Sequence, residues 1–162
     1  MEQSDLRALS PVDGRYAGKA DELRDYFSEF GLLRYRTLVE VRWLQWLADE
    51  PGIEDLAPLT SPMKDMLNRI VDKFSIDDAK HIKKIEVTTR HDVKAVEYYL
   101  REKIGSGTDI GRVGDFIHFA CTSEDINNLA YGLMMRNARD EVLLPQMKKL
   151  LGRLRTMVRD YA

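Results

Sequence analysis

A long heptad-like repeat at the C-terminal end constrains the fold of this chain more than any other feature. Residues recur there at alternating spacings of three and four, as in a helix that packs along other helices; they are Ile126, Leu129, Leu133, Arg136, Asp140, Leu143, Met147, Leu150, Leu154, Met157 and Tyr161. Only Pro145 disfavours helix within the repeat. A helix from Ser123 to Tyr161 would extend about 58 Å at a rise of about 1.5 Å per residue. Because that is too long for a compact domain of 162 residues, we expect it to pack against something larger.

Two charged residues occupy inward positions of this repeat. Arg136 and Asp140 are four residues apart, so the simplest interpretation is that they pair with each other. The alternative is that they meet polar groups on a partner helix and fix its register. The helical pattern also continues to Tyr161 without a Gly or Asn cap after it. We therefore interpret the sequence as an N-terminal fragment of a longer helical-bundle protein.

The rest of the sequence also has helical periodicity and no clear period-two strand pattern. The expected helices cover 19–48 with a break at Gly31, 60–74 with a start at Thr60-Ser61-Pro62, 77–86, and a segment from 88–92 to Ile104. The run Gly105-Ser106-Gly107-Thr108 interrupts this pattern. The sequence therefore predicts an all-α fold, with a small helical N-terminal domain at 1–111 and the truncated beginning of a helical-bundle domain at 112–162.

Composition excludes several classes of function. The chain has 25 basic and 27 acidic residues and a formal net charge of -2, which gives no electrostatic case for nucleic acid or an anionic membrane. No apolar run approaches the roughly 20 residues that span a bilayer. The one cysteine, Cys121, cannot form an internal disulfide or a thiolate metal site. A reducing cytoplasm fits best, and no metal-ligand spacing or glycine-rich phosphate loop is present.

The first candidate site is the segment 10–16, Ser-Pro-Val-Asp-Gly-Arg-Tyr, which lies outside any hydrophobic period. Pro11 fixes one backbone angle and Gly14 permits a positive φ, so the segment predicts a tight turn. That turn would hold Arg15 and Tyr16 side by side, as a pair suited to a phosphate or carboxylate. The alternative is an N-terminal arm whose arginine pairs with a surface acid.

The second candidate site is the segment 88–92, Thr-Thr-Arg-His-Asp, just before a helical run. Asp92 or Thr89 can cap that helix, whose free N–H groups form a positive site. Arg90 and His91 add cationic character where the helix dipole favours acids, so we expect an anion among them. The alternative is that Asp92 neutralises the cluster and His91 is a solvated loop residue.

The third candidate site is the segment 116–125, at the start of the long helix. Thr122 or Ser123 would be its N-cap, complemented by an acid in the first turn; this alone describes any good helix start. However, His118 lies between two apolar residues and needs a partner.

The remaining histidine, His81, lies among lysines and is interpreted as a residue on a helix surface rather than as part of a site. Three anion-friendly sites predict a substrate with several negative charges.

These segments also resemble a known family. Four of them occur in its order: Ser-Pro-Val-Asp-Gly-Arg-Tyr at 10–16, Gly-Leu-Leu-Arg-Tyr-Arg and Glu-Val-Arg-Trp-Leu within 31–44, Thr-Thr-Arg-His-Asp-Val-Lys-Ala-Val-Glu-Tyr at 88–98, and Ile-His-Phe-Ala-Cys-Thr-Ser-Glu-Asp-Ile-Asn-Asn at 117–128. Over its whole length the chain resembles the adenylosuccinate lyases, within the fumarase and aspartase superfamily, and most closely their bacterial branch.

The resemblance implies a carbon–nitrogen lyase of purine nucleotide biosynthesis. It would eliminate fumarate from adenylosuccinate, giving AMP, and from succinyl-aminoimidazole-carboxamide ribotide, without metal or cofactor. The family pattern implies a substrate-binding set in which Arg15 and Tyr16 hold the nucleotide, His118 lies near the phosphate, and the carboxylates are bound by Thr122 and Ser123. It places Arg90, His91 and Asp92 along the pocket; we assign His91 a supporting electrostatic role in catalysis rather than proton transfer.

The resemblance also implies a homotetramer in the cytoplasm, in which helices from four subunits form a central bundle. The family's general acid and serine base would lie beyond residue 162, so the fragment alone is expected to be inactive. Two alternatives remain. An argininosuccinate-lyase-like member has the same elimination and fold, but its substrate lacks the phosphate that the 10–16 segment suits. A non-catalytic helical interaction module would use the seam at 143–161 to join a partner.

Overall fold

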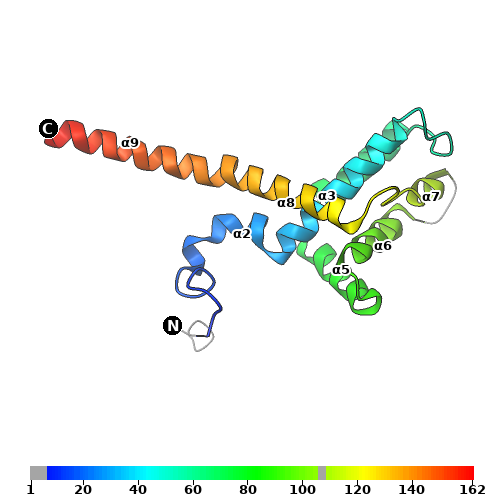
Figure 1. Cartoon of the computed structure of the whole chain (residues 1–162), viewed down its shortest axis with the longest axis horizontal. Helices are drawn as coiled ribbons and strands as arrows, with labels where there is room; N and C mark the ends of the chain where they lie inside the picture. Colours follow the sequence, from blue (N-terminus) through cyan, green and yellow to red (C-terminus); the bar gives the residue numbers. More distant parts are fainter. Residues whose placement is uncertain (1–6, 106–108) are drawn as a thin grey trace. The chain divides into compact units, whose positions relative to one another are not determined.

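The computed structural model describes residues 7–105 and 109–162. Every regular element within these ranges is helical, which confirms the predicted all-α fold (Figure 1). The elements are η1 Ala17–Lys19, η2 Asp21–Leu23, α2 Arg24–Phe27, α3 Glu29–Ala48, α4 Ser61–Asp72, α5 Ile76–Thr89, α6 Asp92–Ile104, α7 Asp109–Gly114, α8 Ser123–Ala138, η3 Arg139–Leu143 and α9 Leu144–Tyr161. In this part of the chain, no helix is long and apolar enough to cross a membrane.

The chain divides into two compact units. One comprises Met1–Gly31 with Leu133–Ala162, and the other comprises Leu32–Gly132. Helices α5 and α6 of the second unit form an antiparallel hairpin (Figure 1). The predicted domain boundary near residue 111 concerns the whole protein and stays a prediction.

Helix α3 is buried on more than one face in the unit formed by Leu32–Gly132. Its apolar residues Leu33, Val41 and Leu44 are almost completely buried, as expected of a helix inside a core. The same helix also buries the polar side chains of Arg36 and Glu40. Buried polar groups need partners, and those partners lie in the candidate site.

The predicted break at Gly31 is wrong, because the helix is interrupted three residues earlier. Ser28 is extended (φ -81°, ψ 168°) between α2 and α3, and its hydroxyl accepts a hydrogen bond from the Gly31 N–H at 3.2 Å. Gly31 lies inside α3, where a Cβ atom would be 2.5 Å from the carbonyl oxygen of Tyr26. The glycine is therefore needed for a close backbone approach rather than for a helix break.

The predicted long C-terminal helix is confirmed. Helices α8 and α9 are joined without a loop by the π-helical turn η3, Arg139–Leu143. This turn ends two residues before Pro145. Pro145 lacks an N–H donor, and its ring would crowd the carbonyl group four residues earlier, within the turn. A wider turn relieves that conflict without ending the helix.

The predicted pairing of Arg136 with Asp140 is wrong. The Arg136 Nε group donates to Asn137 Oδ1 at 3.2 Å, and Asp140 accepts two hydrogen bonds from Arg139 at 2.6 and 3.0 Å. Asp140 lies in the π turn, where the wider spacing removes the four-residue alignment of an α-helix. Both residues of the predicted pair are exposed in this chain.

Candidate functional site

The turn between α5 and α6 places a histidine at the start of a helix. Arg90 ends α5 in the left-handed conformation (φ 52°), and His91 is the N-cap of α6, where its Nδ1 accepts the Lys94 N–H at 3.2 Å. The predicted cap, Asp92 or Thr89, is therefore wrong. Asp92 is already the first helical residue, and the Thr89 hydroxyl donates to the His91 carbonyl oxygen at 3.1 Å.

This cap fixes which hydrogen the neutral His91 ring carries. Since Nδ1 uses its lone pair to accept a hydrogen bond, the ring hydrogen is on Nε2. Nε2 lies 3.5 Å from the Ser123 Oγ atom at the start of α8, and the side chain of His91 is 51% exposed. The second and third predicted sites thus meet, and their contact presents an N–H donor and a hydroxyl group to solvent.

Asp92 is held by a buried arginine that the sequence did not single out as a site residue. Arg36 Nη2 lies 2.6 Å from Asp92 Oδ2, and Arg36 Nε donates to Asn127 Oδ1 at 2.9 Å. Partial burial disfavours the Asp92 carboxylate, but the Val93 N–H and the Arg36 guanidinium outweigh it and lower the pKa of Asp92. Arg36 therefore joins the start of α6 to the second turn of α8.

His118 has the partner that its apolar surroundings required. Its Nδ1 lies 2.7 Å from Oε1 of Glu40, which is completely buried in α3. Burial raises the pKa of Glu40, and the hydrogen bond from His118 opposes that rise. The only sequence signal for Glu40 was an acid between two valines, Val39 and Val41, in an otherwise apolar stretch.

Thr122, rather than Ser123, is the N-cap residue of α8. Asp125 accepts from both the Thr122 N–H at 2.7 Å and its hydroxyl at 2.8 Å, and these bonds lower the pKa of Asp125. Both donors of Thr122 are thus occupied, whereas the Ser123 hydroxyl faces His91. In the same segment, burial, with smaller contributions from Glu40 and Asp125, raises the pKa of Cys121 to about 11.

The pair Arg15 and Tyr16 belongs to the other unit, which comprises Met1–Gly31 with Leu133–Ala162. The Arg15 guanidinium lies over the Tyr16 ring, 4.7 Å from its centroid, so the two side chains are adjacent, as predicted. Gly14 does not adopt the positive φ that a glycine permits, since Gly105 is the only glycine within 7–105 and 109–162 with that conformation. Whether this pair joins the other two sites stays a prediction.

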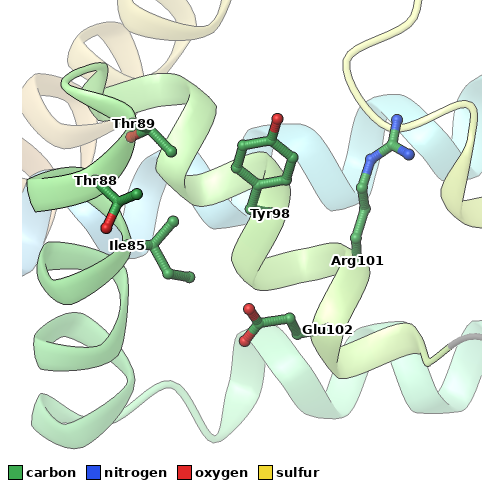
Figure 2. Close-up of a pocket in the computed structure, with 6 residues that line it drawn as sticks. All are labelled: Ile85, Thr88, Thr89, Tyr98, Arg101 and Glu102. Carbon is green, nitrogen blue, oxygen red and sulfur yellow. The ribbon is translucent and has the colours of Figure 1, made fainter.

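A hollow on the α5–α6 hairpin lies next to the second site. It has a volume of about 420 Å³ and is lined by Ile85, Thr88, Thr89, Tyr98, Arg101 and Glu102 (Figure 2). Its charged groups already have protein partners: Arg101 pairs with Glu97 and Asp115, and Glu102 pairs with His81 at 2.6 Å. The hollow therefore offers no unpaired charge to a ligand.

In the part of the chain that the structure describes, no three His, Cys, Asp and Glu side chains are grouped to hold a metal ion. What the site offers instead is a set of hydrogen-bond donors and basic side chains around two helix starts, which suits an anionic organic ligand.

Comparison with known proteins gives a consistent result. A family model described as "Lyase" matches residues 14–162. The chain is 52% identical to an adenylosuccinate lyase of Haemophilus influenzae, 51% to that of Escherichia coli K12 and 50% to that of Vibrio cholerae, each over 99% of this chain. It spans only 35% of the length of each of these relatives.

Proposed function

This chain belongs to the lyase family, and from that membership we propose that the protein is an adenylosuccinate lyase. The observation that carries the proposal is 50–52% identity to three proteins of that name over 99% of the chain. The reaction would release fumarate from adenylosuccinate and from succinyl-aminoimidazole-carboxamide ribotide, as a step of purine nucleotide biosynthesis in the cytoplasm.

The chemistry is acid–base elimination. A base removes a proton from the succinyl group, the carbon–nitrogen bond breaks as the fumarate double bond forms, and an acid protonates the departing nitrogen. No metal or organic cofactor is required. We assign the residues of this chain to binding and positioning, and not to either proton transfer.

The site geometry supports a specific division of these roles. The Ser123 hydroxyl and the His91 Nε2–H, 3.5 Å apart, are suited to one succinyl carboxylate, with Arg90 and Asp92 lining the same pocket. Thr122 would join them only by releasing Asp125. In this proposal His118 lies near the phosphate of the substrate, and Arg15 and Tyr16 hold the nucleotide.

We also propose that the protein is a homotetramer. Along α9, large apolar side chains are exposed in this chain, among them Met147, Leu150, Leu154 and Met157. An apolar stripe of that length is typical of an interface between helices, and matching helices of other subunits would cover it.

The test is fumarate release by the full-length protein, with adenylosuccinate and argininosuccinate as competing substrates. We expect turnover of adenylosuccinate only. Ser123→Ala should lower kcat/KM by about 10- to 100-fold, as expected for losing a hydrogen bond to a charged group. Ser61→Ala, which removes an exposed hydroxyl at the start of α4, is the matched control. Turnover of argininosuccinate, or no fumarate from adenylosuccinate, would refute the proposal.

A further inference from the structure

Helix α3 carries three side chains that each hold a different part of the candidate site. Arg36, Glu40 and Trp43 are spaced by four and three residues, so they lie on one face of the helix. Arg36 binds Asp92 and Asn127, Glu40 binds His118, and the Trp43 Nε1–H donates to the Phe119 carbonyl oxygen at 2.8 Å. The family-like motifs within 31–44 thus have a structural role, although none of these three residues was predicted to bind substrate.

Glu40 is the least satisfied buried charge of this set. Its Oε1 atom contacts His118, but its Oε2 atom is buried without a hydrogen-bond partner among the described residues. The other buried acid, Glu97 on α6, has ion pairs with Lys94 at 2.6 Å and Arg101 at 3.2 Å. A half-satisfied carboxylate in a core lowers stability rather than raising it. Stability alone therefore does not account for Glu40.

The residue that Glu40 holds is in a costly conformation. His118 has φ 64° and Ala120 has φ 58°, and the left-handed region is unfavourable for both residue types. Two contacts from α3 hold this segment: Glu40 at the His118 ring, and Trp43 at the Phe119 carbonyl group. Strained backbone persists only where surrounding contacts determine it, and it is typical of binding and catalytic sites.

The contact with Glu40 leaves one edge of the imidazole for a ligand. An ionised carboxylate only accepts hydrogen bonds, so the hydrogen of a neutral His118 ring is on Nδ1. Nε2 has no hydrogen-bond partner among the residues that the structure describes, and the side chain of His118 is 19% exposed. Nε2 is therefore the atom of this ring that can meet a bound molecule.

We propose that Glu40 is the positioning residue of His118. It holds the ring through Nδ1 and fixes the hydrogen on that atom. Nε2, which accepts a hydrogen bond in that form of the ring, is thereby directed to a hydroxyl group of the bound nucleotide, while Trp43 holds the adjoining backbone. The identity of this ligand rests on the proposed function; the state of the ring does not.

The first measurement reads the ring directly. Solid-state ¹⁵N spectra of the full-length protein, labelled at the histidine ring nitrogens and assigned with His118→Gln, report which nitrogen carries the hydrogen. We expect Nδ1–H in the wild type and in Glu40→Gln, whose amide oxygen can still accept. In Glu40→Leu the hydrogen should move to Nε2, the position that free histidine prefers. An Nδ1 without hydrogen in the wild type would overturn the proposal.

The second measurement is AMP affinity by calorimetry on the same proteins. We expect Glu40→Leu to weaken binding by about tenfold or more and Glu40→Gln to weaken it less, because Gln keeps the ring orientation but loses the charge. Glu102→Gln is the matched control, since it alters another Glu–His pair at the same 2.6–2.7 Å separation on an exposed surface. It should change the His81 signal and leave both His118 and AMP affinity unaltered.

These readouts separate the two proposals. Wild-type protein that shows His118 Nδ1–H but binds no AMP would refute the proposed function and leave the state of the ring intact. AMP affinity unchanged in Glu40→Leu, in a protein that binds AMP, would refute the positioning role.

Discussion

The ion pair between Arg36 and Asp92 joins a buried charge to a half-exposed one, and this asymmetry predicts unequal costs for removing its two members. The Arg36 side chain is 4% exposed and that of Asp92 is 45% exposed. In Arg36→Met the new side chain fills much of the space, and water solvates the remaining carboxylate. The expected loss is about 1.5–3 kcal/mol, the value of a hydrogen bond to a charged group.

Removing the acid instead leaves a cation inside the protein. In Asp92→Ala the guanidinium keeps only the neutral Asn127 as a partner, and an uncompensated buried charge costs about 3–5 kcal/mol. Loss of an acid from the first turn of α6 adds about 0.3–1 kcal/mol. Asp77→Ala, which removes an exposed acid from the first turn of α5, measures that smaller contribution by itself.

The double variant gives the sharpest outcome. Because Arg36→Met removes the unpaired cation, adding it to Asp92→Ala should restore stability, so that the double variant is more stable than Asp92→Ala alone. Urea unfolding of the full-length proteins at one protein concentration gives the ranking from the transition midpoints. Equal losses for the two single variants, or a double variant less stable than Asp92→Ala, would refute this account of the pair.

Three further predictions test other parts of the structure. Gly31→Ala should destabilise the protein by about 1–3 kcal/mol, because its Cβ would lie 2.5 Å from the Tyr26 carbonyl oxygen; Gly18→Ala, with nothing within 4 Å of the new Cβ, is the control in thermal unfolding. Cys121 should react with a thiol reagent at pH 8 about 100-fold more slowly than an ordinary thiol, because burial raises its pKa from 9.0 to about 11; mass spectrometry of its peptide, native against urea-unfolded, decides this. Partial burial opposes ionisation of Asp78, but Lys103 and Ser75 lower its pKa from 3.8 to about 2, so its contribution should be present above pH 4 and be lost as the pH falls toward 2. Asp78→Asn should therefore lose about 1 kcal/mol at pH 6 and progressively less below pH 4.

Local features of the sequence predicted the helices well. The 3–4 spacing from Ile126 to Tyr161 gave the long helix, and Thr60-Ser61-Pro62 gave the start of α4. Both signals lie within a few residues of the structure that they specify. The break at Gly31 failed because the reason for that glycine is a contact with the carbonyl group of Tyr26, five residues away. Periodicity does not report such an approach.

The residues of the candidate site also differ in whether neighbouring residues in the sequence could predict them. His91, Asp92, His118, Thr122 and Ser123 stand in motifs whose chemistry is visible from neighbouring residues. The roles of Arg36 and Glu40 depend on partners 56 and 78 residues away in the sequence. The sequence did not reveal these roles, because an arginine or glutamate in a helical pattern ordinarily indicates a solvated face. Burial reverses that expectation: a charge that the core encloses needs a specific partner, and the partner is thereby held in one orientation. A single face of α3 can therefore orient two segments far apart in the sequence. Under the proposed function, a substitution at Glu40 would therefore act on nucleotide binding through His118 without itself touching the ligand.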